Sequence, residues 1–255
     1  MRRIFLRLVL CCVLPLLMIG LAGRADATPS STLWTNMTPD IQGLNVLHLG
    51  IDNYSTVFRK ARDGGSSFPT DFGLTMGVLR DKKLQLELGF DLIESTDYPL
   101  SFNAKLGYAE GALGTNSLAV QVGIFNAGTE KGVTNQNVAY LVLGHTFPGF
   151  GRLSAGPYSG NSDLLRNSDG GKENTGYMVA FDHGFRPTKG PDGNTFNRFV
   201  FCADYASGKN AIGGGGVGLY YFFTKDVSLV TGPVWFNDTG INGKWKMTTQ
   251  LDVNF

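Results

Sequence analysis

The last eleven residues of the chain, Trp245 to Phe255, alternate between two faces without interruption. Side chains of a β-strand point to opposite sides with period two, so this alternation predicts a strand. One face is mostly apolar and consists of Trp245, Met247, Thr249, Leu251, Val253 and Phe255. The other face is polar and consists of Lys246, Thr248, Gln250, Asp252 and Asn254. A strand of about eleven residues is long enough to cross a bilayer when it is tilted.

The same period recurs along most of the chain, with turn residues between the repeats. The clearest segments are 72–78, 84–92, 100–108, 118–124, 199–205, 217–223 and 227–235, and weaker ones lie near 44–54, 137–147, 151–160 and 174–184. Together with the last strand, these segments predict about twelve strands and no helix. An even number of antiparallel strands can close into a barrel with both chain ends on one side. We therefore expect an all-β fold, a single antiparallel transmembrane β-barrel with up-and-down meander topology.

The connections alternate in length, as they do in membrane barrels. Short turns are expected around 81–82, 148–149 and 225–226, and longer loops at 55–68, 127–136, 160–173 and 237–243. The connections 110–116 and 184–195 are longer than this scheme predicts. A soluble β-sandwich also alternates, but its strands usually have five or six residues. The long apolar face instead fits contact with lipid, where an open sheet edge would leave backbone groups unpaired.

The sequence of segment 84–108 also predicts how its two strands, 84–92 and 100–108, pair with each other. If Thr96 is the centre of the turn, Phe90 faces Phe102 and Glu87 faces Lys105. Cross-strand aromatic pairs and opposite charges each stabilise a ladder by roughly 0.2–1 kcal/mol. A slip by one residue would move Lys105 to the lipid side, which costs roughly 2–4 kcal/mol at mid-depth.

The amino terminus has the features of a secretory signal peptide. A basic start is followed by an apolar stretch, Leu8 to Ala22, and by Ala25-Asp26-Ala27, which fits the rule for a cleavage site. We expect a cleaved signal peptide at 1–27, an N-terminal periplasmic or plug segment at 28–41 and the transmembrane barrel at 42–255. Cys202 is the only cysteine after residue 27, so no disulfide framework is expected.

These termini and the strand pattern resemble Gram-negative outer-membrane β-barrel proteins of the porin-like kind. The resemblance covers nearly the whole chain but identifies no subfamily. It implies location in the outer membrane, contact with outer-membrane lipid, and recognition by the barrel-assembly machinery through the C-terminal strand ending in Phe255. The charge of +1 for the whole chain falls to −2 without residues 1–27, which hold four arginines and one aspartate. This near-neutral charge gives no sign of a nucleic-acid partner.

The polar face of the strands carries the candidate functional residues. We predict that fifteen of them line a pore: Asp71, Lys83, Gln85, Glu87, Asp91, Asn103, Lys105, Gln121, Arg152, Asp182, Arg198, Asp204, Lys246, Gln250 and Asp252. Opposed charges around a wet lumen would act on small solutes. The alternative is a plugged interior in which the charges only pair with one another.

No catalytic, metal or cofactor motif stands out. His48, His145 and His183 lie far apart, and each lacks the serine of the His-x-Ser arrangement found in outer-membrane lipid-acting enzymes. Gly213 to Gly218 matches G-x-G-x-x-G, but an aromatic strand follows it where a nucleotide fold needs a helix. We therefore expect no enzyme, no cofactor and no metal site.

The favoured function is a small channel for passive diffusion of polar solutes. The alternative is a non-conducting scaffold barrel that binds an unidentified protein partner through its outer loops. A lipid-acting enzyme with His145 or His183 as base ranks third.

Overall fold

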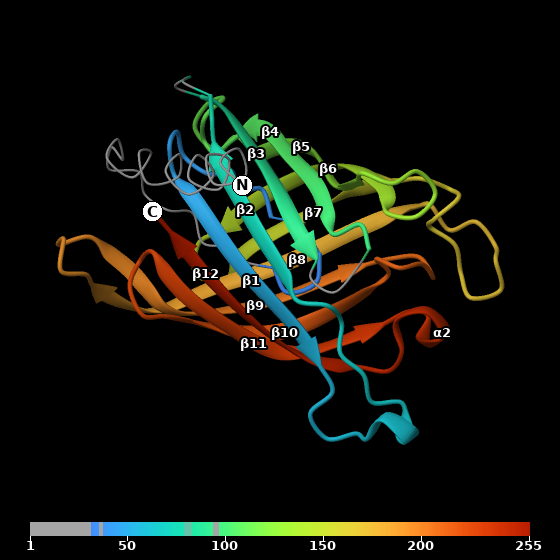
Figure 1. Ribbon diagram of the computed structural model, residues 1–255. Coiled ribbons are helices and arrows are strands. Elements are labelled where there is room, and N and C mark those ends of the chain that lie inside the picture. Colours follow the sequence, from blue (N-terminus) through green and yellow to red (C-terminus); the bar gives the residue numbers. More distant parts are fainter. Residues whose placement is uncertain (1–31, 36–37, 80, 82, 94–96) are drawn as a thin grey trace, which may run out of the picture.

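The computed structural model describes residues 32–35, 38–79, 81, 83–93 and 97–255 (Figure 1). Twelve strands form one closed barrel in which each strand pairs with its neighbours in sequence. Their bounds are β1 Leu47–Ser55, β2 Asp71–Gly77, β3 Leu84–Ile93, β4 Leu100–Tyr108, β5 Ala119–Gly128, β6 Asn135–Phe147, β7 Gly151–Ser159, β8 Thr175–Lys189, β9 Thr195–Ala206, β10 Gly214–Phe222, β11 Val227–Phe236 and β12 Lys246–Asn254. The predicted fold, an antiparallel meander of twelve strands, is confirmed.

The barrel closes where β1 meets β12. Ile51 is the partner of Leu251 in this antiparallel ladder, and Leu47 and Phe255 exchange backbone hydrogen bonds just beyond it. Closure leaves no unpaired strand edge, which is the condition for backbone to lie in hydrocarbon. In the part of the chain that the structure describes, no helix is long and apolar enough to cross a membrane.

The register predicted for the segment 84–108 is also confirmed. Phe90 is the partner of Phe102 and Glu87 is the partner of Lys105 in the β3–β4 ladder. The turn residues 94–96 themselves lie outside the described part of the chain. The predicted signal peptide, residues 1–27, also lies outside it.

The two faces of the wall differ as the alternation predicts. Large apolar side chains are exposed on the outer face, and examples from β3 to β6 and β8 to β11 are Leu88, Phe102, Val122, Leu143, Val179, Phe201, Leu219 and Trp235. On the inner face the two halves of the barrel differ. β1 to β4 and β12 present mostly polar groups, whereas β6 to β11 also present buried apolar groups such as Val138, Val142 and Val230.

The two ends of the barrel carry connections of different length. We call the end that holds Leu47 and Phe255 the terminal end, and the opposite end the loop end. Turns at the terminal end include 148–150 and 223–226, and the β4–β5 connection 109–118 is long, as expected. The expectation of a long connection at 184–195 is wrong, because β8 runs to Lys189 and β9 begins at Thr195. Arg186 has a φ of 59° and Pro187 follows it, and this irregularity disguises the strand in the sequence.

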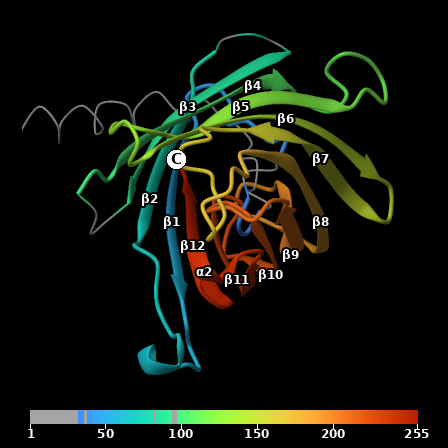
Figure 2. The same cartoon turned by 90° about the vertical axis from the view of Figure 1, so that its right-hand side faces the viewer.

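The loop end is partly covered by its own connections (Figure 2). Leu165, in the connection between β7 and β8, is fully buried against barrel side chains that include Val138 and Met178. The backbone N–H of Ser168 donates to Asp238, which also caps the short helix α2, Thr239–Asn242. The connection between β1 and β2 contains a 3-10 helix, Ala61–Asp63, and projects away from the wall (Figure 1).

Candidate functional site in the barrel lumen

The lumen contains a cavity of about 360 Å³ on the side of β1 to β4 and β12. It follows β1 from His48 to Tyr54, which at roughly 3.3 Å per residue is a path of about 20 Å. Side chains of β1 point alternately to its two faces, and His48, Gly50, Asp52 and Tyr54 lie on the face that lines the cavity. The cavity therefore extends along most of the height of this strand.

The N-terminal segment, described at residues 32–35 and 38–46, lies inside the lumen. Its first anchor is Asp204 on β9, whose Oδ2 accepts hydrogen bonds from the backbone N–H groups of Leu33, Trp34 and Thr35, each at 2.8 Å. The carbonyl oxygen of Leu33 accepts from Tyr54 at 2.7 Å and from Gln250 at 2.6 Å. Leu33 is 2% exposed, so this residue is almost completely enclosed by the barrel.

The glycines of β10 make room for this anchor. A Cβ added at Gly218 would lie 2.7 Å from Cδ1 of Leu33, and one added at Gly216 would lie 3.1 Å from its Cδ2. The G-x-G-x-x-G match in the sequence thus marks a close approach of two chain segments.

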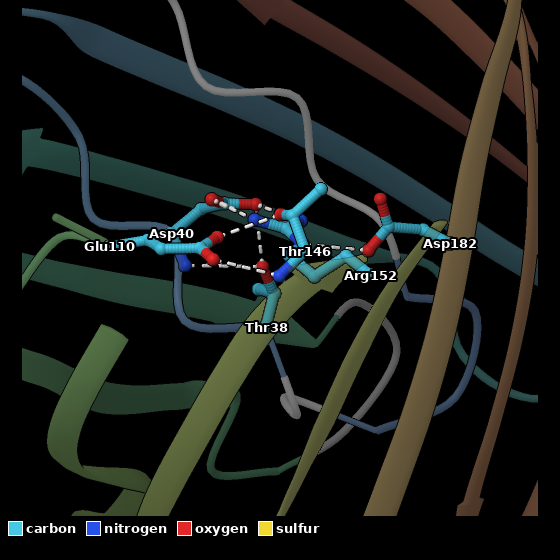
Figure 3. A network of polar contacts seen from close by, with 6 residues as sticks. All are labelled: Thr38, Asp40, Glu110, Thr146, Arg152 and Asp182. Carbon is cyan, nitrogen blue, oxygen red and sulfur yellow. Dashed lines mark hydrogen bonds and ion pairs between the residues drawn. The ribbon is translucent and has the colours of Figure 1, made fainter. Parts of the chain in front are cut away.

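The second anchor joins the segment to β7 and β8 (Figure 3). The guanidinium of Arg152 on β7 donates to both carboxylate oxygens of Asp40, at 2.6 and 2.7 Å, and to Asp182 on β8 at 2.8 Å. A bidentate arginine–carboxylate pair fixes geometry as well as charge. Asp40 also accepts from the hydroxyl of Thr38 at 2.7 Å.

Glu110 lies in the same region, in the connection between β4 and β5 (Figure 3). Its carboxylate accepts from the backbone N–H of Thr146 at 2.8 Å and from its hydroxyl at 2.7 Å, and it pairs with His145 at 2.7 Å. Partial burial by itself raises the pKa of Glu110. The hydrogen bonds from Thr146 and the charges of His145 and Arg152 together lower the pKa by more than burial raises it, so the net pKa of Glu110 lies below its usual value.

The third anchor is Glu87 on β3. Its Oε2 accepts from the backbone N–H of Gln42 at 2.8 Å, and its Oε1 lies 3.8 Å from Nζ of Lys105. The charge pair predicted across the β3–β4 ladder therefore also holds the N-terminal segment. In this way three charged residues on different strands fix the path of the segment through the lumen.

The fifteen predicted residues separate into three groups. Seven line the cavity: Asp71, Glu87, Asp91, Asn103, Lys105, Gln250 and Asp252. Three more, Arg152, Asp182 and Asp204, form or support the anchors of the N-terminal segment.

The remaining five lie elsewhere. Gln121 is buried and donates to Tyr140, and Arg198 donates to the carbonyls of Phe222 and Phe223 at the terminal end. Lys246 is 0% exposed and lies 4.2 Å from the ring centre of Phe68. Gln85 is half-buried, and Lys83 is exposed in the turn before β3.

Several lumen residues were not among the predicted ones. Asp40, His48, Asp52 and Tyr54 all line the cavity. The last three share one face of β1, where a strand was expected without assignment of its faces. Asp40 lies in the N-terminal segment, which has no strand period to orient its side chains.

The histidines and the cysteine take part in ordinary contacts. Nε2 of His48 lies 3.4 Å from Asp252, and His183 stacks on Phe185. Cys202 is buried, and its Sγ lies 3.6 Å from the carbonyl oxygen of Gly218. Among the described residues, no group of three or more histidine, cysteine or acidic side chains could hold a metal ion.

The fold and the lumen together define a closed antiparallel barrel with a charged interior and an internal N-terminal segment. No protein-family model and no curated protein matches the sequence. Among solved structures, an outer-membrane channel from Pseudomonas putida F1 is similar at 11% identity, over 92% of this chain and 99% of that one, with a TM-score of 0.46. A mutant of the Rh. blastica porin is similar at 10% identity, over 72% of this chain, with a TM-score of 0.41. The alignment covers 55% of that porin chain, so this protein matches only about half of its length.

Proposed function

We propose that this protein is an outer-membrane β-barrel that forms a small porin-like channel for passive diffusion of small polar solutes. The observation that carries the proposal is the charged cavity that follows β1 from His48 to Tyr54. A wall whose outer face is apolar and whose inner face carries such a cavity fits a barrel that offers a polar path through lipid. Export with cleavage after Ala27 belongs to the same proposal, and N-terminal sequencing of the mature protein checks it.

The charge pair Glu87–Lys105 is central to the expected mechanism. Both side chains line the cavity, and together they place opposite charges beside a passing solute. Opposed charges at a narrow part of a pore orient dipolar solutes and change the local ion concentration. A permeating solute would pass between this pair and the acidic side chains of β1 and β2.

Single-channel recording in planar bilayers tests the proposal. We expect the purified barrel to conduct, and we expect Lys105→Met to change its conductance and ion preference because a lumen charge is lost. The matched control is Lys172→Met, which removes the same charge from an exposed loop position. A folded barrel that shows no channel events would remove the proposal.

The alternative is a non-conducting scaffold that binds a partner protein through the connections of the loop end. The N-terminal segment within the lumen and the buried Leu165 favour this alternative, since both occupy space that a channel would need. Gentle solubilisation followed by affinity purification distinguishes the two functions. A stoichiometric partner together with a silent barrel would support the scaffold, and a conducting barrel purified alone would contradict it.

A further inference from the structure

We propose that the lumen cavity binds small organic cations, namely short amines and diamines. This inference rests on the proposed channel function and names the class of solute. The first observation is an excess of carboxyl groups over basic groups. Carboxylates of Asp40, Asp52, Asp71, Glu87, Asp91 and Asp252 line the cavity, against Lys105 and His48 on the basic side.

Contacts within the protein neutralise only half of these carboxylates. Asp40 pairs with Arg152, Glu87 with Lys105, and Asp252 with His48. The other three, which we call the unpaired aspartates, are Asp52, Asp71 and Asp91. Within the described residues, none of the three forms an ion pair with a basic side chain. Asp91 accepts a hydrogen bond from the amide of Asn103 at 2.9 Å.

The unpaired aspartates are neighbours on the wall. Asp52 and Asp71 are direct partners in the β1–β2 ladder, and Asp91 is the partner of Gly73 in the next ladder. Like charges directly across a ladder destabilise it. A Cβ added at Gly50 would lie 4.0 Å from Oδ1 of both Asp52 and Asp252, so those two oxygens are at most twice 4.0 Å apart. A single small cation can therefore reach more than one carboxylate.

Two acceptor atoms in the cavity wall, one of them on an unpaired aspartate, lack a donor. Gln42 is 8% exposed, and its side-chain Oε1 has no hydrogen-bond partner. Oδ1 of Asp71 is also buried without a partner. Buried acceptors are normally satisfied, so each of these two positions, at opposite ends of β2, suits a ligand that brings N–H donors.

The shape and lining of the cavity favour an organic cation over a metal ion. In the described chain, no three acidic or histidine side chains converge as metal ligands would. The volume of about 360 Å³ exceeds what a bare ion needs, and the rings of Trp34, Tyr54 and Phe68 border the same space. Aromatic rings attract ammonium groups and cover methylene chains.

Calorimetric titration of the detergent-solubilised full mature protein with 1,4-diaminobutane tests this inference without conduction. We expect saturable binding of the diamine and no binding of 1,4-butanediol, its uncharged analogue. For the double variant Asp52→Asn with Asp71→Asn, we expect the affinity to fall about tenfold or more, because two partly screened attractions are lost. The control Asp169→Asn removes a charge from an exposed loop position and should bind as the wild type does.

Reversal potentials in a salt gradient then separate this inference from the proposed function. Cation preference in the wild type that falls in the double variant supports both. Diamine binding without channel events supports the cation site and contradicts the channel. Channel events without diamine binding, or equal binding of the diamine and the diol, overturn the cation site. If the double variant fails to fold, the single variant Asp52→Asn and the comparison of diamine with diol still decide the question.

Discussion

Replacing Asp204 with alanine is expected to raise the single-channel conductance of the barrel severalfold. The carboxylate of Asp204 accepts the backbone N–H groups of Leu33, Trp34 and Thr35 inside the lumen. Without it, three buried or partly buried donors would lose their acceptor, at up to about 1–3 kcal/mol each. The N-terminal segment avoids this cost by leaving the site, because its backbone can then bond to water. Its departure would open the lumen between β9 and β12.

Two variants control this experiment. Asp204→Asn keeps one acceptor oxygen, and we expect a conductance between those of the wild type and the alanine variant. Asp169→Ala removes an exposed carboxylate of the loop end and should leave the conductance unchanged. Limited proteolysis gives a second measurement, since a released segment is cut faster within residues 32–46. A folded Asp204→Ala barrel with wild-type conductance and wild-type proteolysis would show that the segment does not obstruct the lumen.

The fold could be predicted because its determinants are local. A period of two over nine or ten residues defines both the strand and its faces, as in β3 and β4. The pair Glu87–Lys105 fixed the register of this hairpin because the opposite register would place both charges in lipid. Neither inference needed knowledge of a distant part of the chain.

The path of the N-terminal segment could not be predicted in the same way. Its anchors join residues that are far apart in sequence, such as Leu33 with Asp204 and Asp40 with Arg152. Most of the donors are backbone N–H groups, which every residue except proline possesses. Asp204 looks like any other inward carboxylate of a barrel strand. The sequence therefore left open whether the segment enters the lumen.

The apolar packing that fills one side of the lumen could not be predicted from the sequence for a related reason. On β11, Val230 and Val234 are inward and fully buried, while Leu229 and Trp235 belong to the outer face. A strand that is apolar on both faces shows only weak alternation of apolar and polar residues. The sequence therefore does not show whether its inner face packs against other side chains or faces water. Apolar packing on this side leaves most of the charged lining of the cavity on β1 to β4 and β12, while β5, β6 and β8 add lining residues such as Ile124, Tyr140 and Met178.

Leu88→Arg is expected to destabilise the folded barrel in lipid by roughly 2–4 kcal/mol. Leu88 lies at the middle of β3 on the outer face and is 48% exposed, although it is a large apolar residue. In the proposed membrane setting this surface contacts hydrocarbon, where a guanidinium loses its hydration. Urea unfolding of the barrel in phospholipid vesicles measures the loss.

The matched control is Asn103→Arg, on the neighbouring strand but on the inner face. Asn103 lines the cavity and donates to Asp91, so an arginine there meets water and a carboxylate. We expect it to change stability by less than about 1 kcal/mol, since a partly exposed ion pair contributes little. The contrast between the two positions is the decisive quantity, because both variants add the same charge at a similar height of adjacent strands. Equal losses at both positions would mean that the outer face does not contact lipid, and the proposed membrane location would then fail together with the channel.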